Sequence, residues 1–130
     1  MIDAATRESV HARAGNACEY CGLQQHHSPL AALQIEHILP RKHRGGDNVD
    51  NLALACIDCN IHKGSNIAGI DPATGALSEI FHPRRHSWEE HFEWHGVRIV
   101  GKTSIGRATV EVLSMNSDEQ LQLRTALQRK

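Results

Sequence analysis

EHILPRKHRGGDNVDNLALACIDCNIHK, residues 36–63, is the stretch of this chain that decides its fold. It opens with an adjacent acid and imidazole, Glu36 and His37, in an apolar run that Pro40 ends. A polar loop with a Gly-Gly pair follows, and a short apolar segment then leads into a cysteine pair. Strand interiors seldom hold two adjacent ionisable groups, so Glu36 and His37 are candidates for a functional site.

The four cysteines form two Cys-x-x-Cys pairs, Cys18 with Cys21 and Cys56 with Cys59, separated by 34 residues. Such a turn brings two thiolates to one tetrahedral zinc ion, and a second turn completes a four-thiolate site. Zinc binding of this kind contributes about 10 kcal/mol to the folding of a small domain. Redox-active thiols, unpaired buried cysteines and an iron site are the alternatives for the same residues.

The bulk composition is that of a globular protein. The chain has 130 residues, of which 40% are hydrophobic and 22% charged, which predicts one domain over 1–130 with a modest core. No stretch approaches the roughly 20 apolar residues of a membrane span. The first ten residues, MIDAATRESV, contain no secretory leader pattern, so we expect a cytoplasmic protein.

The charge of the chain is close to balanced, with a formal net charge of −1. A protein that holds nucleic acid by electrostatics alone is usually more basic, but a local patch suffices. Arg41, Lys42 and Arg44 make such a patch beside Glu36 and His37. A second basic cluster, 84–86, is interpreted as ordinary surface.

Local patterns predict a mixed α+β fold. Asp3 and Gly15 are suited to cap a helix between them, and Ser-Trp-Glu-Glu at 87–90 and Ser-Asp-Glu-Gln at 117–120 resemble capping boxes. The expected elements are helices at 3–14 and 59–66 and from 87 and 117 onward, and strands at 33–39, 97–100 and 107–113. Residues 52–56 are a short apolar segment.

The combined motif resembles the HNH endonuclease family, in its H-N-N form with a zinc knuckle. The matching residues are Glu36-His37, Pro40, Gly45-Gly46, Asn51-Leu52, Cys56, Cys59, Asn60 and Lys63. The resemblance implies a ββα-metal nuclease core over 7–67. Residues 68–130 would then be a C-terminal extension with a β-hairpin and a helix.

The resemblance also implies residue roles. His37 would be the general base, and Asn51 would brace the loop and help to orient the imidazole. Glu36 and Asn60 would hold a catalytic Mg²⁺ or Mn²⁺ ion, with His62 as the alternative to Asn60. The nucleic-acid contacts would come from Arg41, Lys42, Arg44 and Lys63.

These roles make a structural demand, because a regular strand sends neighbouring side chains to opposite faces. Glu36 and His37 reach one cleft only if the strand ends or bends at 36–38, with Glu36 facing Asn60 across an ion.

The expected function is a metal-dependent DNA endonuclease that nicks or cuts a duplex, with RNA left open as a substrate. It would need structural zinc and a catalytic divalent ion, with no small-molecule cofactor and no membrane. The alternatives are a catalytically silent nucleic-acid-binding module and a redox or iron protein built on the four thiols.

Overall fold

The computed structural model of the chain describes residues 2–28 and 31–128. Its α-helices are α1 (Ala4–Ala14), α2 (Ile57–Lys63), α3 (Trp88–His91), α4 (Ser104–Val112) and α5 (Asp118–Gln128). Its strands are β1 (Gln34–His37), β2 (Leu52–Ala55), β3 (Ala68–Ile70), β4 (Leu77–Glu79), β5 (Phe92–His95) and β6 (Arg98–Gly101). Short 3-10 turns lie at η1 (Gln25–His27), η2 (Arg41–His43) and η3 (Val49–Asn51). The fold is mixed α+β, as predicted.

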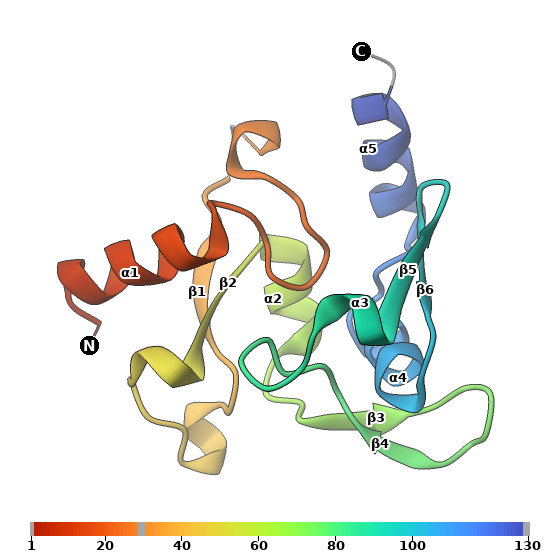
Figure 1. Cartoon of the computed structure of the whole chain (residues 1–130), viewed down its shortest axis with the longest axis horizontal. Coiled ribbons are helices and arrows are strands. Elements are labelled where there is room, and N and C mark those ends of the chain that lie inside the picture. Colours follow the sequence, from red (N-terminus) through yellow and green to blue (C-terminus); the bar gives the residue numbers. More distant parts are fainter. Residues whose placement is uncertain (1, 29–30, 129–130) are drawn as a thin grey trace.

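The strands form three separate antiparallel hairpins, β1–β2, β3–β4 and β5–β6, within the described ranges. In Figure 1, α1 and β1–β2 lie on one side of the molecule, and the other two hairpins lie with α4 and α5 on the other side. Helix α2 lies between these two groups. None of the described helices is long and apolar enough to cross a membrane.

Helix α1 begins and ends where its sequence predicts. The Asp3 carboxylate accepts a hydrogen bond from the Thr6 amide at 2.8 Å, which satisfies one of the free N–H groups of the first turn. Gly15 adopts a left-handed conformation with φ of 63° and closes the C-terminus. The Ser117 hydroxyl likewise accepts a bond from the Gln120 amide at the start of α5.

Two expectations for the extension are wrong. Residues 107–113 lie in and just after helix α4 and not in a strand, because Thr103 caps the helix at the Gly106 amide. Its inward residues recur at helical spacing, which overrides the β-branched composition. The helix expected from Ser87 is the single turn α3, since Ser87 makes no side-chain cap and Phe92 already pairs with Gly101 in β5–β6.

A hydrophobic core joins the two halves of the chain. Its fully buried members include Tyr20, Leu52 and Leu54 from the first half and Phe92 and Leu113 from the second. Polar contacts reinforce this junction where the first cysteine pair lies.

At this junction, the Trp88 indole N–H donates to the Tyr20 carbonyl oxygen at 2.8 Å. Arg84 forms an ion pair with Glu19, whose other carboxylate oxygen accepts from the Leu54 amide. The extension is thus attached directly beside the cysteines.

Candidate functional site

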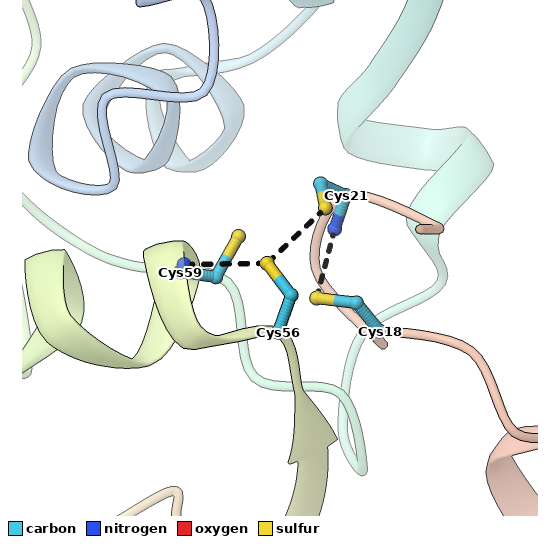
Figure 2. Close-up of side chains that lie close together, drawn as sticks. All are labelled: Cys18, Cys21, Cys56 and Cys59. Carbon is cyan, nitrogen blue, oxygen red and sulfur yellow. Dashed lines mark hydrogen bonds between the residues drawn. The ribbon is translucent and has the colours of Figure 1, made fainter. Parts of the chain in front are cut away.

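The four cysteine side chains meet as the spacing of the two pairs predicts. Cys18 and Cys21 come from the loop after α1, Cys56 caps α2, and Cys59 lies in its first turn (Figure 2). All four are buried, and their sulfur atoms lie within 4.8 Å of one another. The Cys21 amide donates to Cys18 Sγ at 3.5 Å and the Cys59 amide to Cys56 Sγ at 3.4 Å.

The four buried thiols alter one another's protonation. Burial raises the pKa of the Cys18 thiol, but hydrogen bonds from the other three cysteines outweigh it, so the pKa is well below that of a free thiol. The pKa values of Cys21 and Cys59 are raised well above the ordinary value, first through their contacts with Cys18. Four buried thiolates cannot coexist without a positive charge, and tetrahedral thiolate coordination is the preferred arrangement of zinc.

The other end of the β1–β2 hairpin carries His37, whose side chain keeps 16% of its surface exposed. Its Nε2 atom lies 2.7 Å from Asp47 Oδ1, and the Arg41 guanidinium donates to the same oxygen at 3.0 Å. Arg41 Nε also lies 3.4 Å from His37 Nε2. One nitrogen cannot both donate to Asp47 and accept from Arg41, so we assign the proton to Nε2 on the strength of the shorter, charge-assisted bond.

The carboxylate of Asp47 is stabilised by these two neighbours. The hydrogen bond from His37 and then the charge of Arg41 hold the pKa of Asp47 below its usual range. With Nε2–H directed at Asp47, the lone pair of the neutral ring lies on Nδ1. Asp47 therefore selects the imidazole tautomer whose Nδ1 can accept a proton.

Asn51 closes the loop that carries Asp47. Its side-chain oxygen accepts from the Leu39 amide at 2.8 Å, and its side-chain nitrogen donates to the carbonyls of Leu39 and Gly46 at 3.0 and 2.9 Å. A Cβ atom at Gly45 would lie 1.6 Å from the Leu39 carbonyl oxygen, so only glycine fits there. These bonds brace the loop in the way that the family resemblance implies for Asn51, and its part in catalysis stays a prediction.

Glu36 and His37 do not reach one cleft, and this part of the sequence interpretation is wrong. Strand β1 stays paired with β2 through His37, so Glu36 and His37 alternate and the Glu36 side chain is directed inward. One Glu36 oxygen accepts a hydrogen bond from the Tyr20 hydroxyl, and the other lies 3.0 Å from Lys63 Nζ. Burial raises the pKa of Glu36 above the ordinary value, while the Lys63 charge opposes the shift.

The other two residues assigned to the catalytic ion also have protein partners. The Asn60 side-chain nitrogen donates to the Gln34 side-chain oxygen at 2.6 Å. His62 Nδ1 lies 2.8 Å from the Asp58 carbonyl oxygen, one helical turn back on α2. In this arrangement Asn60 Nδ2 and His62 Nδ1 therefore make contacts within the protein.

The basic residues divide into two groups. Arg41, Lys42 and Arg44 are exposed on the η2 turn beside His37, where they can reach a phosphate. Lys63 is only 1% exposed, so the expectation that it contacts nucleic acid is wrong for this arrangement. Its ammonium group is directed into the protein because Glu36 and backbone carbonyls surround it.

Comparison with known protein families gives a match that covers this site. Residues 18–66 match the model of the HNH endonuclease family. The chain carries an HNH domain. No significant match was found among curated proteins, nor among solved structures. The HNH domain includes both cysteine pairs, the β1–β2 hairpin and α2, and the extension after residue 66 lies outside it.

HNH enzymes use divalent metals, and this HNH domain offers one preformed cluster in the part of the chain that the structure describes. The four cysteines are the one group of three or more His, Cys, Asp or Glu residues there whose ligand atoms gather. Glu36 does not fit a shared cation as it is arranged, because the Tyr20 hydroxyl and Lys63 Nζ engage both of its carboxylate oxygens.

Sequence reasoning missed two residues of the HNH domain site. Asp47 directly follows the Gly-Gly pair, and a carboxylate there, across a short loop from a strand-end histidine, was an available signal. Tyr20 lies between the first two cysteines, and its bond to Glu36 depends on tertiary packing. No pattern in the sequence signals that contact.

Proposed function

We propose that the HNH domain hydrolyses phosphodiester bonds in DNA, with His37 as the general base. The observation that carries this proposal is the His37–Asp47 contact at 2.7 Å at an exposed strand end. A neutral imidazole with an oriented ring is suited to remove a proton from water near neutral pH. The adjoining Arg41, Lys42 and Arg44 supply positive charge for the phosphate backbone.

The proposed reaction uses these residues in one step. His37 Nδ1 takes a proton from a water molecule as the water oxygen bonds to phosphorus. The bond from phosphorus to the 3′ oxygen breaks, and that oxygen gains a proton from solvent, which leaves a 5′-phosphate and a 3′-hydroxyl. Arg41 lies close enough to Asp47 and His37 to stabilise the added negative charge at phosphorus.

The cysteines have a different role in this proposal. Cys18, Cys21, Cys56 and Cys59 would hold a structural zinc ion that joins the loop after α1 to α2. Zinc in a closed four-thiolate site has no open position for substrate, so its contribution is to folding. Stoichiometric iron or a visible absorption band in the purified protein would favour the iron alternative.

A plasmid cleavage assay tests the nuclease function. Wild-type protein is incubated with supercoiled DNA in Mg²⁺, in Mn²⁺ and in chelator, beside His37→Ala and the control His43→Ala, which changes an exposed histidine of η2. We expect His37→Ala to lower the cleavage rate by about 10²- to 10⁴-fold, the usual contribution of a general base. A folded His37→Ala variant that cuts as fast as wild type would refute the assignment.

A nucleic-acid-binding module without cleavage is the second candidate. The observation that favours it is the engagement of both carboxylate oxygens of Glu36, the residue assigned to the catalytic ion, by Tyr20 and Lys63. Duplex binding in a gel-shift assay, with no product in any divalent metal, would select this function over the first.

A further inference from the structure

A buried polar trio lies directly behind the His37 strand end. Tyr20 is 0%, Lys63 1% and Glu36 4% exposed, and the HNH resemblance assigns the two charged members of this trio to the surface of the site. Lysine and glutamate are almost never fully buried unless they are paired. The burial of these charged side chains therefore requires partners inside the protein.

Lys63 satisfies its three N–H donors within the protein. Its Nζ atom lies 3.0 Å from Glu36 Oε2, 3.2 Å from the His37 carbonyl oxygen and 3.0 Å from the Ile38 carbonyl oxygen. An ammonium group carries three donors and no acceptor, so Lys63 has no N–H left for a phosphate. Glu36 is likewise used on both oxygens, by Tyr20 and by Lys63.

The two carbonyl contacts fix the backbone on which the His37 ring is mounted. Lys63 holds the carbonyls of His37 and Ile38, and the Ile38 amide donates to the Asn51 carbonyl at 2.9 Å. The chain is therefore held from both sides immediately after His37. A displacement of about 1 Å at a catalytic group can cost about 10²-fold in rate, so this restraint bears directly on the base.

Lys63 also connects His37 to the cysteine cluster. It is the last residue of α2, and the same seven-residue helix carries Cys59 in its first turn, with Cys56 as its N-cap. A single rigid helix thus links the cysteine cluster to the backbone of the proposed base.

We infer that Lys63 is a positioning residue for His37 and that Glu36 is the buried counter-ion of Lys63, not a ligand of a catalytic ion. The positioning part rests on the proposed function. The counter-ion part stands on the contacts of Glu36 alone, so the two parts have separate measurements.

The counter-ion part is tested by stability and metal binding in zinc-loaded protein. Glu36→Gln and Lys63→Met each leave one buried charge unpaired, so each lowers the melting temperature. The double variant Glu36→Gln/Lys63→Met recovers much of that loss. We expect Mn²⁺ titration, monitored by electron paramagnetic resonance, to give the same Mn²⁺ affinity for wild type and Glu36→Gln. The absence of Mn²⁺ binding in both proteins is the same result. Mn²⁺ affinity that is tenfold or more weaker in Glu36→Gln, or additive stability losses in the double variant, would overturn this part.

The positioning part is tested by the same double variant. A methionine side chain in place of Lys63 cannot donate to the two carbonyls, so we expect the cleavage rate constant to fall about 100-fold with KM unchanged even where stability has recovered. Lys63→Arg, which keeps donors for the carbonyls, should regain part of the rate. Lys102→Met and Glu111→Gln, which change exposed residues of the extension, are matched controls. A double variant that cleaves at the wild-type rate would overturn the inference.

A readout that needs no cleavage separates failure of this inference from failure of the nuclease function. The imidazole nitrogen shifts of His37, measured by long-range ¹H–¹⁵N NMR, should move in the double variant, while those of exposed His43 should not. Unchanged His37 shifts would refute the positioning role even if the protein proves to be a binding module. Moved shifts in a protein that never cuts DNA would support the inference and reject the nuclease.

Discussion

The two ends of helix α2 differ in how their side chains are directed. At the N-terminal end, Cys56 and Cys59 meet Cys18 and Cys21 as their spacing predicts (Figure 2). At the C-terminal end, Lys63 was expected at the surface and instead lies buried against Glu36. A Cys-x-x-Cys turn fixes its two thiols locally, whereas a lysine at a helix end follows whichever buried partner the fold supplies. At the N-terminal end of α2, local geometry sets the directions of the side chains. At the C-terminal end, packing sets them.

The largest expected effect is at the cysteine end. Cys59→Ser, or zinc removal by a chelator, should unfold the domain, because binding of structural zinc contributes about 10 kcal/mol or more in zinc-finger peptides. Circular dichroism melts and zinc analysis would measure it. Cys59→His keeps a zinc ligand and should retain metal and fold. A Cys59→Ser protein that melts like wild type would show that the fold does not depend on the cysteine end of α2.

The next largest effect is expected at His37, near the C-terminal end of α2, where Lys63 holds the backbone. Asp47→Asn removes the carboxylate that holds His37 Nε2–H, so the ring loses its preferred tautomer and orientation. We expect the cleavage rate to fall about tenfold or more, up to the roughly 10²- to 10⁴-fold contribution of a general base, at unchanged zinc content. Asp50→Asn, in the η3 turn of the same loop, is the matched control. Equal rates for the two variants would remove Asp47 from the site.

A smaller effect is expected outside both ends, in the extension. The buried Asp71 carboxylate accepts both bonds of the Arg107 guanidinium at 2.9 Å, and these bonds hold the pKa of Asp71 far below its usual range. A depressed folded-state pKa gives stability that is present above the unfolded pKa and lost as pH falls. Asp71→Asn should therefore melt earlier than wild type at pH 7, and the difference should shrink below about pH 4.

Zinc content should stay unchanged in Asp71→Asn at pH 7, because the four cysteines do not contact Asp71 in the described structure. Loss of zinc together with the melting shift would show that the extension controls the cysteine end, and it would weaken the contrast between the two ends of α2.

The smallest effect concerns salt dependence. Arg41 is largely exposed, so Arg41→Ala should leave the melting temperature unchanged and lower the slope of log affinity against log salt by about 1. Lys63→Arg should leave that slope unchanged, because a buried cation releases no counter-ion from DNA. Fluorescence anisotropy with a labelled duplex would measure both slopes. A reduced slope in Lys63→Arg would place Lys63 at the DNA after all.

Much of the first half of the chain was predictable because its signals are local. The Asp3 and Gly15 caps of α1, the β1 segment and the cysteine cluster follow from residue type and spacing. The extension was less predictable. Residues 107–112 include three β-branched residues yet are helical, because the Thr103 cap and burial against neighbouring elements outweigh weak strand propensity.

The sequence by itself determined the four-cysteine cluster and the strand that carries Glu36 and His37, because each depends on residue type and short spacings. Only the tertiary structure decided which side of β1 faces the interior, and with it the pairing of Glu36 with Lys63 and of His37 with Asp47. The physical reason is that strand alternation sends two adjacent side chains to opposite faces. Packing against Tyr20 and α2 then selects which of the two is buried.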